Sequence, residues 1–181
     1  MNLIKSTIDD LFVLEPSTFS DNRGYFMESY KKEKFNDLLG NIDFVQENES
    51  GSFKGVLRGL HFQHPPYSQT KLVRCISGKV LDVAVDLRKK SKSYGNFFSI
   101  ELSSENKKQL LIPNGFAHGF QVLSNYAIVN YKVDNYYNPK YESGIIWNDN
   151  DLVIDWSNDV NPILSDKDLK LDSFNNFNSP F

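Results

Sequence analysis

Short runs in which apolar and polar side chains alternate occupy most of this chain, and a period of two predicts β-strands. The clearest run covers residues 80–87, where Val83, Val85 and Leu87 share one face and Asp82 and Asp86 lie on the other. This run predicts an antiparallel strand with one covered face. Further strands are predicted over residues 24–30, 44–50, 55–62, 71–76, 97–102, 109–112, 118–123, 127–133 and 144–147. So many short strands predict an all-β fold, either a sandwich or a barrel.

Turn-forming residues divide these runs, and two helices interrupt them. Ser77-Gly78 predicts a hairpin turn. A short helix is predicted over residues 32–39, stopped by Gly40, and another begins after Ser165. The chain shows no internal repeat and no interdomain linker, so we expect residues 1–181 to form a single domain. The Asn-rich end, about residues 175–181, is predicted to be a flexible tail.

Length, charge and cysteine content narrow the class of protein. The 181 residues suffice for one core that needs no metal or disulfide support. A net charge of -3 with mixed signs provides no electrostatic footprint for nucleic acid. No signal-peptide pattern or membrane-length apolar stretch occurs, so we expect a cytoplasmic protein with no membrane partner. The single cysteine, Cys75, lies in an apolar run, which favours a buried, inert thiol.

Histidine is scarce in this chain, and two of the three histidines lie within two residues of a glycine in a predicted strand. Glycine inside a strand indicates a bulge or a ligand close to the backbone, which marks His61 and His118 as candidates. Asp168 is a candidate partner that would orient the imidazole of His61. It also fits a capping box that begins at Ser165, so the sequence leaves helix capping and histidine pairing both open.

A candidate acid and several cations lie elsewhere in the chain. Tyr131 shares strand parity with apolar residues and is predicted to point inward, where its hydroxyl can donate a proton. Candidate anion ligands are Arg23, Arg58, Lys71 and Lys167. In a regular strand Arg58 and His61 face opposite sides. Both reach one pocket only if a bulge near Gly59 shifts the register.

Metal and nucleotide-cofactor motifs are not found in the sequence. His61 and His64 form an H-x-x-H pair, but on a strand this spacing points the two rings apart and no further ligand completes the set. The chain has no Gly-rich dinucleotide fingerprint and no P-loop. We therefore expect chemistry carried by side chains alone, with no metal and no cofactor.

Seven ordered segments together resemble the dTDP-4-dehydrorhamnose 3,5-epimerase family, from the first predicted strand to Asp168. They are DNRGYFMESY (21–30), FVQEN (44–48), GVLRGLHFQ (55–63), QTKLV (69–73), IPNGFAHGF (112–120), YK (131–132) and WND (147–149). Each is weak alone, whereas the ordered set is specific. The resemblance implies a cupin-like jelly-roll β-barrel with a few short peripheral helices.

The resemblance also implies an isomerase of dTDP-L-rhamnose biosynthesis, a pathway that serves lipopolysaccharide or capsule O-antigen. It would invert carbons 3 and 5 of dTDP-4-dehydro-6-deoxy-D-glucose, giving dTDP-4-dehydro-L-rhamnose without a cofactor. By the resemblance the catalytic residues are His61 as base, Asp168 as its partner, Tyr131 as acid and Lys71 at the enolate oxygen. The implied substrate-binding residues are Arg23, Glu28, Gln46, Asn48, Arg58, His118, Tyr137, Glu142 and Lys167.

Family members often form homodimers in which the N-terminal strand of one subunit completes the neighbouring site, so Arg23 and Glu28 are predicted to act across an interface. Two other functions stay open. One is a related epimerase that inverts only carbon 3 or carbon 5, or that acts on another nucleotide 4-keto sugar. The other is a sugar-nucleotide binding module on a catalytically idle barrel.

Overall fold

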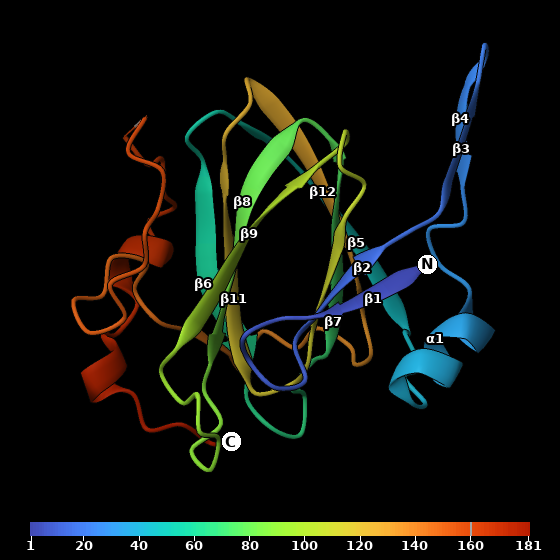
Figure 1. Ribbon diagram of the computed structural model, residues 1–181. Helices are drawn as coiled ribbons and strands as arrows, with labels where there is room; N and C mark the ends of the chain where they lie inside the picture. Colours follow the sequence, from blue (N-terminus) through green and yellow to red (C-terminus); the bar gives the residue numbers. More distant parts are fainter. Residues whose placement is uncertain (160) are drawn as a thin grey trace.

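Two antiparallel sheets packed face to face form the body of the protein in a computed structural model that describes residues 1–159 and 161–181 (Figure 1). One sheet has the spatial order β1 (Asn2–Lys5), β2 (Phe12–Glu15), β10 (Gln109–Ile112), β7 (Lys71–Ser77), β12 (Tyr126–Val133) and β5 (Gln46–Phe53). The second has the order β13 (Glu142–Gly144), β6 (Leu57–Gln63), β11 (Phe116–Val122), β8 (Lys79–Asp86) and β9 (Phe97–Ser103). The predicted all-β jelly roll is confirmed.

The remaining elements lie outside this barrel. A separate hairpin of β3 (Thr18–Asp21) and β4 (Gly24–Met27) projects away from it, and α1 (Lys32–Leu39) follows (Figure 1). Two 3₁₀ turns, Asp168–Lys170 and Phe174–Asn176, lie in the C-terminal segment. No helix in the described part of the chain is long and apolar enough to span a bilayer.

The interior of the barrel is filled from both sheets. Val73 and Val129 from the first sheet meet Ala84 and Phe120 from the second, and all four belong to one buried cluster. The outer face of the second sheet is covered by the C-terminal segment, which carries Trp156. The prediction of one covered face for β8 is therefore wrong. Both faces are buried, and the aspartates of β8 lie on the inner side of a closed fold, at 0% exposure.

The turn at Gly78 does not close a hairpin, which corrects a second prediction. Strand β7 pairs with β10 and β12, whereas β8 pairs with β9 and β11, so the chain crosses there from one sheet to the other. Gly78 has φ +75°, and a Cβ there would lie 2.1 Å from the carbonyl oxygen of Tyr126. The crossing therefore requires glycine for its conformation and for space.

The C-terminal segment differs from its prediction in two ways. The helix expected after Ser165 is only the short 3₁₀ turn Asp168–Lys170. Residues 175–181, predicted to be a flexible tail, pack onto the barrel. Ser179 is 3% exposed and hydrogen-bonds the carbonyl of Leu87, and Lys89 N–H donates to the carbonyl oxygen of Phe181 at 3.1 Å. Phe177 and Phe181 pack against the buried cluster beneath the segment, and this burial of apolar surface holds it in place despite its high asparagine content.

Candidate active site

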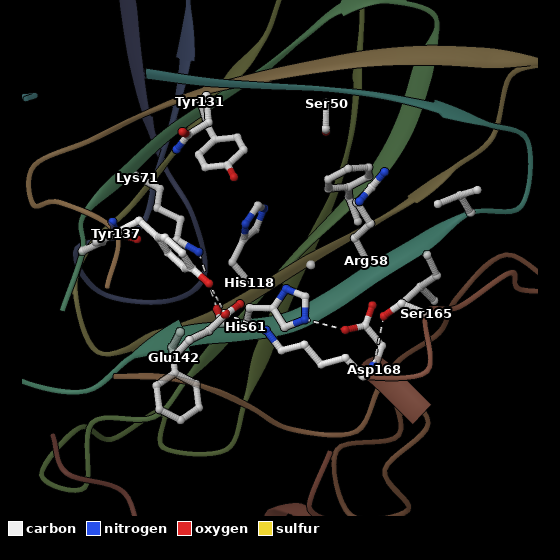
Figure 2. Close-up of a pocket in the computed structure, with 18 of the residues that line it drawn as sticks. Ser50, Arg58, His61, Lys71, His118, Tyr131, Tyr137, Glu142, Ser165 and Asp168 are labelled. Atoms are coloured by element: carbon white, nitrogen blue, oxygen red, sulfur yellow. Dashed lines mark hydrogen bonds and ion pairs between the residues drawn. The ribbon is translucent and has the colours of Figure 1, made fainter. Parts of the chain in front are cut away.

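A cavity of about 710 Å³ opens between the two sheets and reaches the C-terminal segment. Its walls bring together residues that are far apart in the chain. Most of the predicted site residues line it, namely Gln46, Asn48, Arg58, His61, Lys71, His118, Tyr131, Tyr137, Glu142, Lys167 and Asp168. Figure 2 shows the central residues of this group directed into one space.

His61 and Asp168 form a close pair on one wall of the cavity. The Nε2 atom of His61 lies 2.6 Å from Oδ1 of Asp168, whose side chain is 5% exposed (Figure 2). Burial raises the pKa of this carboxyl, but the hydrogen bond and charge of His61 and the Ser165 hydroxyl outweigh it, so the pKa is lowered. The carboxylate is therefore charged at neutral pH. With Nε2–H donating to it, Nδ1 of the ring remains the acceptor.

The same aspartate also takes part in a capped turn, through its backbone rather than its side chain. Asp168 N–H donates to Oγ of Ser165 at 3.1 Å, and Leu169 N–H donates to the Ser165 carbonyl. The two alternatives left open by the sequence are thus compatible. Ser165 caps the turn, and the carboxylate of Asp168 is directed to His61.

A register shift lets Arg58 and His61 share the cavity. In the pairing of β6 with β11, His61 lies opposite His118 but Arg58 lies opposite Phe120, so the offset changes by one residue between them. Gly59 lies in this irregular stretch with φ +135°, and a Cβ there would lie 2.5 Å from the Cα of the facing strand. Only glycine fits this close approach.

Tyr131 lies on the opposite sheet from His61. It belongs to β12, whose neighbouring inward residues Val129 and Val133 are fully buried, as the strand parity predicted. Burial raises the pKa of Tyr131, and the charge of Arg58 opposes this only in part. The phenol is therefore protonated at neutral pH and can donate to a group held between the two sheets.

Lys71 and His118 lie between these two walls (Figure 2). Burial lowers the pKa of Lys71 to about 8, against the attraction of Asp82 and Glu142. Burial also lowers the pKa of His118, although its Nε2 lies 3.0 Å from both carboxylate oxygens of Asp82. Neutral His118 donates to Asp82, and Lys71 brings a positive charge near the carbonyl oxygen of His61, at 3.5 Å.

A set of polar side chains that contact one another lies at the mouth of the cavity. The Tyr137 hydroxyl donates to Glu142 at 2.6 Å, and Lys167 pairs with the same carboxylate oxygen at 2.6 Å. The hydrogen bond to Glu142 is the main cause that raises the pKa of Tyr137 to about 12. Gln46 accepts a hydrogen bond from the backbone N–H of Tyr137 at 3.1 Å, which ties this loop to β5.

Arg23 and Glu28 lie away from this cavity. Arg23 is in the turn of the projecting hairpin, with its side chain 85% exposed and paired with Asp21. Glu28 follows the hairpin and pairs with Lys34. Within one copy of the chain, neither residue lines the site.

Comparison with known proteins assigns the chain to one family. The sequence profile described as dTDP-4-dehydrorhamnose 3,5-epimerase matches residues 5–176. The chain belongs to this family. The curated dTDP-4-dehydrorhamnose 3,5-epimerase of Shigella flexneri is 51% identical over 175 residues, which cover 96% of either chain.

Solved structures of epimerases agree with this assignment. The dTDP-6-deoxy-D-glucose-3,5-epimerase of Legionella pneumophila, in complex with dTDP-4-keto-L-rhamnose, has a TM-score of 0.95 and 45% identity, covering 98% of this chain and 94% of its own. A 3'-monoepimerase of Streptomyces bikiniensis, in complex with dTDP-quinovose, has a TM-score of 0.89 and 31% identity, covering 93% and 85%. The fold is thus common to epimerases of different outcome.

Two residues that hold side chains and backbone of this cavity in place were not singled out from the sequence. Asp82 appeared only as a polar position on β8, yet an aspartate within so apolar a strand indicates a buried partner such as His118. The amide of Gln63 donates to the carbonyl oxygens of Tyr67 at 2.7 Å and Tyr136 at 3.2 Å, and accepts from Asn138 N–H at 2.6 Å. It therefore holds the backbone on both sides of Tyr137. Only the tertiary structure shows these contacts.

Cys75 and the H-x-x-H pair contribute no visible chemistry. Cys75 is 5% exposed, and burial raises the pKa of its thiol to about 11. His64 packs edge-on against the Phe62 ring and does not line the cavity. Among residues 1–159 and 161–181, no group of three or more His, Cys, Asp or Glu side chains is arranged to hold a metal ion.

Proposed function

We propose that this protein inverts carbons 3 and 5 of dTDP-4-dehydro-6-deoxy-D-glucose, giving dTDP-4-dehydro-L-rhamnose. The observation that carries the proposal is the pairing of His61 with the buried carboxylate of Asp168 on one sheet, across the cavity from Tyr131 on the other. Inversion at carbon requires a base on one face and a proton donor on the opposite face, and this arrangement supplies both.

The base step follows from the acidity of the sugar hydrogens and from the free Nδ1 atom of His61. A 4-keto group acidifies the hydrogens on carbons 3 and 5, so one base beside the ring serves both centres. Nδ1 of His61 removes the proton, and Asp168 stabilises the imidazolium that forms. Lys71 then stabilises the negative charge that develops on the keto oxygen, because a cation in a partly dry cavity acts strongly on an enolate.

The acid step returns a proton to the opposite face of the sugar. Tyr131 donates it, since its raised pKa keeps the phenol protonated until the enolate collapses. Arg58 lowers the pKa of that phenol and stabilises the phenolate left behind. Before the second inversion the imidazolium of His61 releases its proton to solvent and the phenolate of Tyr131 takes one up. The same cycle at the second carbon then completes the double inversion.

The polar mouth of the cavity is the proposed site for the nucleotide portion. Tyr137 would stack on the base, as the family resemblance implies, while Lys167 supplies a cation for the diphosphate. Glu142, Gln46 and Asn48 hold this region in place through their hydrogen bonds.

The test is proton exchange in deuterium oxide, followed by NMR of the sugar protons without added metal or cofactor. The wild-type protein is expected to exchange the protons at both carbons. His61→Ala is expected to lose both exchanges, whereas Tyr131→Phe should keep exchange and lose inversion, because only the donor is removed. If the wild-type protein exchanges neither carbon, the substrate is wrong and a binding module becomes the better assignment.

A second candidate is inversion at one carbon only, and the likeness to a 3'-monoepimerase supports it. The higher identity to 3,5-epimerases favours the double reaction. Exchange confined to one carbon in the same NMR experiment would select the mono-epimerase.

We further propose a homodimer of this single epimerase domain in which the β3–β4 hairpin completes the neighbouring cavity. Phe19 and Phe26 on the hairpin are 67% and 70% exposed, which is apolar surface that a partner would cover. Arg23 lies in the turn of the same hairpin, away from the cavity of its own chain. A second copy of the chain explains both observations.

Subunit mixing tests the exchange. His61→Ala and Arg23→Ala are each expected to be weakly active alone. In a refolded equal mixture, activity should rise to about a quarter of wild type, since random pairing leaves one complete site in half of the dimers. No rise above the separate variants, despite mixed dimers by mass spectrometry, would place Arg23 outside the neighbouring site.

A further inference from the structure

Every second side chain of β5 faces the barrel interior. Gln46, Asn48 and Ser50 line the cavity, and Ser52 is buried beyond them. Three of these four side chains have polar partners. Gln46 donates to Asn48 at 2.8 Å, and Ser52 accepts a hydrogen bond from Nε of Arg58 at 3.1 Å. Ser50 differs from its neighbours on the strand.

The hydroxyl of Ser50 is a buried oxygen that no described residue supplies with a hydrogen-bond partner. Figure 2 shows Ser50 on the wall between Tyr131 and Arg58. A buried hydroxyl usually has a partner, because leaving it unpaired costs stability. An unpaired group on the wall of a substrate cavity is explained if the substrate provides the missing partner.

The strand register places this hydroxyl next to the proposed acid. Tyr131 lies opposite Asn48, and Ser50 lies opposite Val129, two positions away on the same inward face. Diagonal neighbours of this kind have Cα atoms about 7–8 Å apart, within reach of a long side chain or a shared ligand. Ser50 therefore borders the space in which Tyr131 must meet a carbon of the sugar.

The chemistry of a serine selects one kind of partner. A serine hydroxyl both donates and accepts, as a sugar hydroxyl does. The anionic groups of the substrate and its keto oxygen only accept, and Lys71, Arg58 and Lys167 are available for them. Ser50 also lies four residues along β5 from Gln46, on the same face. Gln46 contacts the Tyr137 loop, where the nucleotide is proposed to bind.

We infer that Ser50 is a specificity residue that hydrogen-bonds a hydroxyl group of the substrate's hexose and fixes the ring against Tyr131. The inference rests on the proposed epimerase function and goes beyond it by assigning a sugar contact. If this hydrogen bond is lost, the hexose binds more weakly and its orientation in the cavity is less fixed. The relative rates of proton exchange at its two reacting carbons then change.

The binding test compares dTDP with dTDP-glucose, which carries a hexose but lacks the reactive keto group. By calorimetry, Ser50→Ala should bind dTDP-glucose about threefold to tenfold more weakly than wild type, which corresponds to one neutral hydrogen bond. Its affinity for dTDP should be unchanged. Equal weakening of both ligands, or no change in either, would overturn the inference.

Kinetics and stability give independent readouts. Ser50→Ala should lower kcat/KM by a similar factor and change the ratio of proton exchange at carbons 3 and 5. Its melting temperature should not fall, because an unpaired hydroxyl is removed. Ser99→Ala, at an exposed serine on β9, is the matched control and should leave all values unchanged. If wild type exchanges both carbons and Ser50→Ala exchanges them equally fast in the same ratio, the inference fails while the proposed function stands.

Discussion

Replacing Lys71 with methionine should stabilise the protein at neutral pH while removing most of its activity. The pKa of Lys71 falls from 10.5 to about 8, mainly through burial. One pKa unit corresponds to about 1.4 kcal/mol, so keeping Lys71 charged costs the folded state about 3 kcal/mol below pH 8. This cost already includes the attraction of Asp82 and Glu142, which raise the pKa. Methionine keeps the length of the stem without the charge.

The sign of the pH dependence follows from the lowered pKa. Between pH 8 and 10.5 the unfolded state binds more protons at Lys71 than the folded state, so wild-type stability rises with pH relative to the variant. Lys71→Met should therefore exceed wild type by up to about 3 kcal/mol at pH 7, or about 6–12 °C in melting temperature. The gap should shrink as pH approaches 10.5.

Urea unfolding at pH 7 and pH 10 measures both quantities. Lys5→Met, at an exposed lysine on β1, is the control and should show the same small difference at both values. Turnover of Lys71→Met should fall about 10²- to 10³-fold, as expected when one donor to a developing oxyanion is lost. A variant less stable than wild type at pH 7, or a stability gap that does not change with pH, would refute the reasoning.

Three further substitutions test the remaining contacts of the site. Asp168→Asn keeps the capped turn but weakens the orientation of His61. Turnover should therefore fall about 10²- to 10⁴-fold with little change in melting temperature. A loss of stability with full turnover would instead indicate that Asp168 has a structural role only. Gln63→Leu should raise KM and weaken dTDP binding, with kcat less affected, because the loop that carries Tyr137 loses its hydrogen bonds to the Gln63 amide. An unchanged KM would contradict this prediction. Gly59→Ala should reduce the yield of folded protein, measured by circular dichroism, since its Cβ meets the backbone of β11; a wild-type melting temperature would show that the strand can yield.

Several elements of the fold could be read directly from local pattern. The helix Lys32–Leu39 and the strand Gln109–Ile112 have the predicted bounds, and most other strands differ by one to four residues at an end. The strands β1, β2 and β3 were missed. The sequences of β1 (NLIK) and β2 (FVLE) place apolar residues in succession instead of alternating them, and β3 (TFSD) is exposed along its whole length. The shortened helix after Ser165 shows how a good capping signal can end in a single turn.

The sequence by itself determined the all-β class, the ordered motifs of the family and the inward direction of Tyr131, since each depends on residues close together in the chain. The tertiary structure alone decided which sheet each strand joins, how the C-terminal segment covers β8, and which residues share the cavity. His61 and Asp168 are separated by 107 positions, and their contact depends on the path of the whole chain. The Ser50 hydroxyl, for which no described residue provides a hydrogen-bond partner, is of the same kind, because a missing partner can be recognised only after the neighbouring residues have been placed.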